Sequence, residues 1–175
     1  MKKLLFILLS MTTLVSAQTA KESEQSNAEK FSAKSGTLMQ KEFIEVGNLK
    51  KCKISVVYFT DLISNTKQSA LKFEYEVASS YSTDTKSAIL DKDEIDGLMK
   101  SIKIIQDKVI ITTPANYTEV NYRSRSGFET GCYMSKGTWS SYLKLERFDS
   151  KSYVWLTKED LPTLYSILEQ AKLKM

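Results

Sequence analysis

The sequence contains no histidine among its 175 residues. Histidine is the commonest general base and metal ligand in proteins, and it activates serine and cysteine nucleophiles. Its absence excludes Ser-His and Cys-His catalytic pairs as well as imidazole metal sites. We therefore expect a protein that is not an enzyme and has no catalytic residue, metal ligand or cofactor.

Glycine is also scarce, with six residues in the chain. So few glycines make a phosphate-cradling loop improbable, and neither the P-loop spacing nor the dinucleotide-binding fingerprint occurs. A CxxC pair is absent as well. These absences exclude the commonest nucleotide-dependent and thiol-redox functions.

Cysteine occurs twice, at Cys52 and Cys132. In an oxidising compartment such a pair is compatible with a disulfide, which would stabilise the fold by restricting the unfolded chain. The alternative is two buried, unpaired thiols in strands, because a free cysteine packs like a small apolar residue. The sequence leaves both possibilities open.

Residues 1–17 have the pattern of a secretory signal peptide. Lys2 and Lys3 precede an apolar run that begins at Leu4, and Val15 and Ala17 place short side chains before a cleavage site. The run is too short and wrongly flanked for a stable membrane span, although a retained anchor helix is the alternative. We expect a secreted or periplasmic protein with no membrane span after cleavage.

Cleavage there would remove two of the 25 basic residues and none of the 21 acidic ones, which leaves a net charge of +2. Nucleic-acid-binding proteins usually carry a clustered basic excess, so nucleic acid is not the expected partner. Residues 18–35 have one large apolar side chain, Phe31, and are predicted to form a flexible polar linker. Residues 36–175 are predicted to form a single α+β domain.

Two segments of this domain, residues 90–105 and 156–171, repeat one helical pattern. Apolar residues recur at the same offsets in both copies, at a 3.6-residue period. Asp91 with Glu94, and Thr157 with Asp160, have capping-box spacing, although Pro162 would shift the second helix start toward Asp160. The apolar residues of the two stripes are Ile95, Leu98, Met99, Ile102 and Ile105, and Leu161, Leu164, Tyr165, Leu168 and Ala171.

Strand-like segments precede each helix in a corresponding order. They alternate apolar and polar residues or are rich in β-branched and aromatic residues. Residues 108–114 are compatible with either a helix extension or a strand. The predicted architecture is an antiparallel sheet with two helices on one face, built from two pseudo-repeated βββ(β)α halves at about 36–107 and 108–175. The predicted strands cover residues 36–46, 53–60, 70–77, 86–90, 118–126, 128–134, 141–146 and 151–156.

The acidic cluster at residues 91–96 suggests either a calcium loop or a capped helix. The EF-hand pattern requires a glycine at its sixth position, and Gly97 is one place late. Acidic side chains in a first helical turn interact favourably with the helix dipole. We therefore interpret the cluster as a helix start.

Four residues are candidate ligand contacts. Arg123 and Arg125 share one face of a predicted strand with Asn121, where guanidinium groups could bind an anion, or simply face solvent. Trp139 lies in a polar run beside a glycine, so it is the preferred exposed aromatic contact. Trp155 is expected to be at least half buried. Trp139, Tyr142, Tyr153 and Trp155 could together form an aromatic platform, but some of these rings must belong to the core.

These observations favour an exported, non-enzymatic binding or accessory protein that uses the sheet face opposite the helices. Its partner would be a small ligand or a protein; the sequence determines neither the ligand nor the oligomeric state. Duplicated ββββα units also occur in single-strand-binding folds of the Whirly and PUR type, which this topology resembles without sharing their motifs. A carboxylate-based hydrolase is a further alternative.

Overall fold

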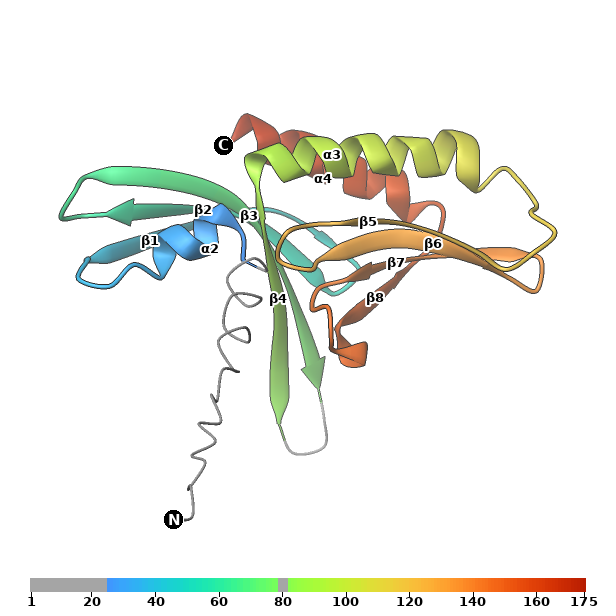
Figure 1. Cartoon of the computed structure of the whole chain (residues 1–175), viewed down its shortest axis with the longest axis horizontal. Coiled ribbons are helices and arrows are strands. Elements are labelled where there is room, and N and C mark those ends of the chain that lie inside the picture. The colour runs from blue at the N-terminus through green and yellow to red at the C-terminus, as the bar shows by residue number, and fades with distance from the viewer. Residues whose placement is uncertain (1–24, 79–81) are drawn as a thin grey trace, which may run out of the picture.

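A computed structural model describes residues 25–78 and 82–175 of the chain. It contains two antiparallel four-stranded sheets, each followed in sequence by a long helix (Figure 1). Both sheets are up-and-down meanders, ordered β1-β2-β3-β4 and β5-β6-β7-β8. The strands are β1 Met39–Leu49, β2 Cys52–Asp61, β3 Thr66–Ala78, β4 Thr83–Asp91, β5 Thr118–Arg123, β6 Glu129–Ser135, β7 Thr138–Lys144 and β8 Tyr153–Leu156.

The α+β class and the two similar ββββα halves are confirmed, whereas the expectation of one sheet is wrong. The strands divide into two sheets because β4 and β5 are not paired with each other. Residues 108–114 form neither an α-helix extension nor a strand. A π-helical turn, Ile105–Val109, ends the first long helix, and irregular backbone follows it up to β5.

The two long helices are α3, Lys92–Ile104, and α4, Asp160–Leu173. Their predicted apolar stripes face the core, and eight of the ten stripe residues are buried. Glu94 accepts a hydrogen bond from the Asp91 backbone N–H at 2.9 Å, as the capping-box spacing predicts. In α4 the helix begins at Asp160, so Pro162 lies in the first turn, where its missing N–H costs little.

Each helix packs against the sheet of the other half. α4 lies on β1 and β2, and α3 contacts β5 in addition to β3 and β4. A glycine permits each approach, because a β-carbon on Gly47 would lie 3.2 Å from Ile167 and one on Gly97 would lie 3.1 Å from the Tyr122 ring. The two halves therefore share one continuous core rather than two separate ones.

The centre of this core is an aromatic contact between the halves. Phe73 of β3 and Phe128, just before β6, stack with ring centroids 4.8 Å apart, and both are fully buried. Cys52 and Cys132 belong to the same core as free thiols. The possible disulfide is therefore not formed: Cys52 lies opposite Tyr75 in the first sheet, and Cys132 opposite Ser141 in the second. Burial raises their pKa values to about 12 and about 11, so both thiols are unreactive.

The outer face of the first sheet carries a short helix, α2, Asn27–Ser32. Ala28 and Phe31 pack there against Val57 and Phe59 of β2, in a second, smaller apolar cluster. The linker prediction is therefore wrong for residues 26–32. The sequence analysis overlooked a capping box between Ser26 and Glu29, because the segment is mostly small, polar and charged. In the structure this capping box stabilises the first turn of α2.

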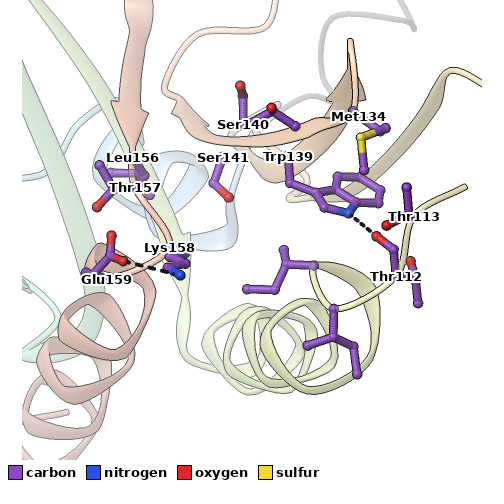
Figure 2. Close-up of a pocket in the computed structure, with 14 residues that line it drawn as sticks. Thr112, Thr113, Met134, Trp139, Ser140, Ser141, Leu156, Thr157, Lys158 and Glu159 are labelled. Atoms are coloured by element: carbon purple, nitrogen blue, oxygen red, sulfur yellow. Dashed lines mark hydrogen bonds and ion pairs between the residues drawn. The ribbon is translucent and has the colours of Figure 1, made fainter.

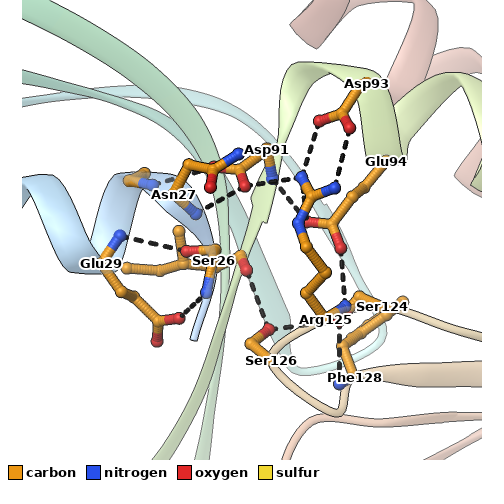
Figure 3. A network of polar contacts seen from close by, with 12 residues as sticks. Ser26, Asn27, Glu29, Asp91, Asp93, Glu94, Ser124, Arg125, Ser126 and Phe128 are labelled. Carbon is orange, nitrogen blue, oxygen red and sulfur yellow. Dashed lines mark hydrogen bonds and ion pairs between the residues drawn. The ribbon is translucent and has the colours of Figure 1, made fainter. Parts of the chain in front are cut away.

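The carboxylate of Asp91 joins three parts of the molecule (Figure 3). It accepts backbone hydrogen bonds from Asn27 at 2.7 Å and Ala28 at 2.9 Å, at the start of α2. It also forms an ion pair with Arg125, whose Nη2 lies 2.7 Å away in the loop between β5 and β6. Asp91 itself ends β4 and precedes α3, so one buried side chain connects α2, the first half and the second half.

The other acidic residues of this cluster extend the same network. Arg125 forms two hydrogen bonds with Asp93, and its backbone N–H donates to Glu94 at 2.6 Å. The guanidinium of Arg125 lowers the pKa of Asp93. No metal-binding group of acidic or cysteine side chains occurs in residues 25–78 and 82–175. Asp91 is the N-cap of α3, and Asp93 and Glu94 lie in its first turn, so the structure agrees with the interpretation of the cluster as a helix start.

A second polar cluster holds the middle of the same strand. The ammonium group of Lys86 in β4 lies 2.5 Å from Asp149 and 3.8 Å from Glu146, both in the segment between β7 and β8. The hydrogen bonds to Asp149 and to Asp84 raise the pKa of Lys86. Between the two polar clusters, the Ser126 hydroxyl donates to the Ile89 carbonyl at 3.0 Å. Loops of the second half therefore cover the free edge of β4.

The predicted signal peptide, residues 1–17, and the predicted linker residues 18–24 lie outside the described residues. Within residues 25–78 and 82–175, no helix has the length and apolar character needed to cross a membrane.

Asp91→Ala is expected to destabilise the fold by about 3 kcal/mol, because it leaves two backbone donors and a guanidinium without their shared buried partner. The matched control is Asp93→Ala, whose exposed carboxylate contacts only Arg125 and should cost less than about 1 kcal/mol. Urea denaturation of both variants measures the difference. Equal losses would contradict a central role for Asp91.

Candidate functional site

The outer face of the second sheet carries a row of aromatic side chains. Tyr142 of β7 is paired with Gly131 of β6 on one side and with Trp155 of β8 on the other, so these three residues point to the same face. Side chains two positions apart along a strand also share a face, so Tyr133 of β6 and Tyr153 of β8 point to this face as well. Tyr117, just before β5, adds a ring beside Tyr133 at a centroid distance of 6.4 Å. We call Tyr117, Tyr133, Tyr142, Tyr153 and Trp155 the aromatic face.

The rings of the aromatic face contact one another in a continuous series. Tyr153 and Trp155 are nearly parallel with centroids 5.1 Å apart, and Tyr142 meets both edge-on. Tyr133 meets Trp155 edge-on at 6.2 Å, and the Lys144 ammonium lies 5.2 Å above Tyr153. Such contacts hold the rings in place without requiring a ligand.

Three large side chains in this region are substantially exposed. Trp155 is 56% exposed, Tyr117 is 66% exposed and Phe148, in the loop beside the face, is 83% exposed. Large aromatic rings carry much apolar area, and exposing several of them together to water is unfavourable. Clustered exposed rings therefore often mark a surface that binds another molecule. The surface is therefore suited to contact with a partner.

A shallow hollow of about 440 Å³ lies between the aromatic face and the polar side chains of β5. The buried carboxylate of Glu129 lies at this hollow, where it accepts from Arg123 Nε at 2.8 Å and from the Asn121 amide at 3.3 Å. Burial raises the pKa of Tyr142 to about 12, so its hydroxyl stays protonated. The hollow thus offers both hydrogen-bond donors and fixed acceptors.

Gly131 is required at the centre of this face. A β-carbon there would lie 2.3 Å from the Val120 carbonyl oxygen and 2.8 Å from the Asn121 β-carbon. Val120 and Asn121 belong to the neighbouring strand β5, so their backbone cannot move away without disturbing the ladder. The glycine therefore allows β5 and β6 to approach each other closely at this point.

The four predicted contact residues occupy three different places. Asn121 and Arg123 share the hollow, as their common strand face predicts. Arg125 does not join them, because β5 ends at Arg123 and the chain turns, which directs its guanidinium to Asp91 and Asp93. Trp139 lies on the opposite side of the sheet, packed against the core.

The expectations for the two tryptophans are reversed in the structure. Trp155 was expected to be at least half buried but is the more exposed of the pair, because Val154 and Leu156 supply the core side of β8. Trp139 was the preferred exposed contact, but it is partly buried and donates from its indole N–H to the Thr112 carbonyl at 2.8 Å. Sequence reasoning also missed Tyr133 and Glu129. These two residues alternate with Thr130 and Cys132 along β6, and this pattern could have predicted that they share the outer face of the strand.

No protein-family model matches the chain, and no curated protein or solved structure matches it significantly. The geometry of the aromatic face and its hollow therefore carries the functional proposal alone.

Gly131→Ala is expected to destabilise the protein by about 2–4 kcal/mol, because the added methyl group meets backbone rather than a movable side chain. Gly97→Ala is the matched control: its β-carbon meets only the Tyr122 ring, and alanine favours the helix by about 1 kcal/mol. Thermal denaturation followed by circular dichroism compares the two variants. A Gly131→Ala protein as stable as the control would show that β5 and β6 do not approach so closely.

Proposed function

We propose that this chain is an exported, non-enzymatic binding protein that docks a partner protein on the aromatic face of its second sheet. The single observation that carries the proposal is the mutually packed row of tyrosine and tryptophan rings on a sheet face that no helix of the described residues covers. Tyrosine, tryptophan and arginine are the residues most enriched at protein-binding hot spots.

The first half provides an internal precedent for how such a face is covered. The outer face of its sheet binds α2, which places Ala28 and Phe31 against Val57 and Phe59. On the second sheet, α2, α3 and α4 all lie elsewhere, and Trp155 of the equivalent face is exposed (Figure 1). We infer that the partner protein packs a short apolar segment on the aromatic face, as α2 packs Ala28 and Phe31 on the outer face of the first sheet.

The charges around the aromatic face favour a protein over a nucleic acid. The basic residues Arg123, Lys144 and Arg147 are accompanied by the acidic residues Glu119 and Glu129, so both signs of charge occur at the hollow. A nucleic-acid site would instead combine stacking rings with a predominantly basic groove. Charges of both signs around an aromatic patch are typical of protein–protein interfaces, where each charge can meet an opposite charge on the partner protein.

A non-enzymatic role agrees with the acid–base properties of the described residues. A carboxylate-based hydrolase needs one acid whose pKa is raised so that it stays protonated. The carboxyl groups with a shifted pKa are all shifted downward, by ion pairs or hydrogen bonds, and Glu129 is already paired with Arg123. The shifted groups are Asp61, Asp93, Asp149, Glu159 and Asp160.

Trp155→Ala is expected to weaken binding of the partner at least about tenfold, because a central exposed aromatic ring at an interface contributes about 2 kcal/mol. The matched control is Phe43→Ala, which removes an exposed ring, 55% accessible, from edge strand β1 of the first sheet. Wild type and both variants are immobilised, proteins of the exported fraction are captured, and the captured partner is then purified and titrated by calorimetry.

Retention by wild type and Phe43→Ala, with loss in Trp155→Ala, supports the proposal. Equal binding by all three proteins, or capture of no protein at all, contradicts it. Single-stranded oligonucleotides are titrated in parallel: affinity that falls steeply with salt and depends on Trp155 would assign the aromatic face to nucleic acid instead. Sedimentation of the protein alone shows whether a second copy of this chain is the occupant.

Export is tested by the intact mass of the protein recovered outside the cytoplasm. Cleavage after Ala17 predicts a chain that begins at Gln18, because the signal peptide is removed during secretion. Measured without reductant, the mass should equal that of residues 18–175 with both thiols free, since Cys52 and Cys132 are unbonded. A mass lower by two hydrogens would reveal a disulfide, and a chain retaining Met1 would contradict cleavage.

A further inference from the structure

A second pocket lies on the core side of the second sheet, away from the aromatic face. It occupies about 510 Å³ between the segment after the π-helical turn, the β6–β7 hairpin and the start of α4 (Figure 2). We call it the Trp139 pocket, after the ring that forms one wall. Its volume is within the range of about 300–1,000 Å³ that is typical of small-molecule sites.

Ser141 is the first indication that this pocket binds a ligand. The residue is only 5% exposed, and it lines the pocket with its hydroxyl directed into the open space (Figure 2). In the described part of the chain its hydroxyl has no hydrogen-bond partner, although every fully enclosed side-chain polar atom there has one. Because this hydroxyl opens into the pocket and has no protein partner, it is available to hydrogen-bond a ligand group in place of water.

Other hydroxyl groups converge on the same space. Thr112, Thr113 and Thr157 line the pocket. Thr112 donates to the Val109 carbonyl at 2.8 Å, and Thr157 donates to Asp160 at 3.0 Å, so both oxygens keep lone pairs for accepting. The Ser141 hydroxyl, whose proton is not used in the protein, can donate or accept as its partner requires. The lining therefore matches a ligand that itself carries several hydroxyl groups.

The electrostatics of the Trp139 pocket exclude strongly charged ligands. At its rim, Lys158 and Glu159 form an ion pair 3.9 Å apart, so the two charges cancel (Figure 2). The start of α4 could attract an anion, but Glu159 and Asp160 already occupy that position, and their lowered pKa values keep them ionised. A neutral ligand fits this arrangement better than a phosphate or a carboxylate.

Trp139 supplies an apolar wall of fixed orientation. Its indole N–H donates to the Thr112 carbonyl, which holds the ring in place and leaves its face available. Aromatic faces carry a negative quadrupole and attract weakly positive C–H groups. Leu156 and Met134 line the pocket as well. Apolar side chains and hydroxyl groups are thus interspersed around the pocket, with Thr112 and Thr113 beside Trp139 and Thr157 beside Leu156 (Figure 2).

We propose that the Trp139 pocket binds a neutral sugar, with the C–H face of the pyranose ring on Trp139 and its hydroxyl groups on Ser141 and the threonines. A sugar ring combines an apolar C–H face with a rim of hydroxyl groups, and the pocket offers partners for both, an aromatic ring and several hydroxyl-bearing side chains. This site is separate from the aromatic face and does not depend on a protein partner.

The chain contains two tryptophans, so fluorescence can report on this pocket directly. In a Trp155→Phe background Trp139 is the sole tryptophan, and its emission is followed while glucose, galactose or N-acetylglucosamine is added. We expect at least one of these sugars to give a saturable change, with a dissociation constant on the order of 1 mM. The reciprocal protein, Trp139→Phe, should show no saturable change from Trp155.

Ser141→Ala in the same background should weaken binding about threefold to tenfold through loss of one hydrogen bond. Ser135→Ala, at the exposed end of β6, is its control and should bind normally. Glucose 6-phosphate should bind more weakly than glucose. Amide shifts in two-dimensional NMR of the full chain provide a second readout, and thermal denaturation verifies that each variant is folded.

The proposal is overturned if none of the three neutral sugars gives a saturable response in fluorescence or NMR at concentrations about tenfold above the expected constant. It is also overturned if the sugar phosphate binds more tightly than glucose, or if binding is unaffected by Ser141→Ala. A response in which NMR shifts lie on the aromatic face rather than around Trp139 would assign the sugar to the other site.

Discussion

The buried carboxylate of Asp91 is the constraint on which the arrangement of the two halves depends. It lies where β4 ends and α3 begins, and it binds backbone donors of α2 and the guanidinium of Arg125 (Figure 3). A charge removed from water must be paired and hydrogen-bonded, so these partners are required as well as stabilising. The position of α2 and the course of the β5–β6 loop both follow from satisfying this one group.

The same requirement explains why two meanders form one molecule. The free edge of β4 would expose unpaired backbone groups, and loops of the second half cover it instead of another strand. Lys86, in the middle of that edge, is held by Asp149, and Asp91, at its end, is held by Arg125. Between these polar clusters, Phe73 and Phe128 bring the apolar surfaces of the halves together.

Much of the fold could be predicted from the sequence because its strands and helices have strong local periodicity. The stripe that includes Ile95 and Leu98, and the matching one of α4, identified both helices, and Glu94 identified the first cap. The division into two sheets could not be predicted, since it depends on long-range contacts of Lys86 and Arg125. The helix α2 was missed because six residues with two apolar side chains have little periodicity.

The candidate site was harder to predict than the fold. Strand alternation correctly grouped Asn121 with Arg123, but it failed for Arg125, where β5 has already ended. For the tryptophans, β8 is apolar on both faces, so its pattern does not tell which side faces the core. Only the assembled sheet shows that Val154 and Leu156 face inward and that Tyr153 and Trp155 therefore project outward.

The difference between the two halves gives the pseudo-repeat its functional meaning. Both sheets present an outer face, but the first is covered by α2 with small and apolar contacts, whereas the second has rings and charges in the equivalent place. Val57 and Phe59, which α2 covers permanently, need no polar group because they do not meet water. The tyrosines and Trp155 combine apolar area with polar edges, which suits a surface that meets water when free and a partner when bound. Within residues 25–78 and 82–175 no helix covers the outer face of the second sheet, so this is the half on which binding is to be sought.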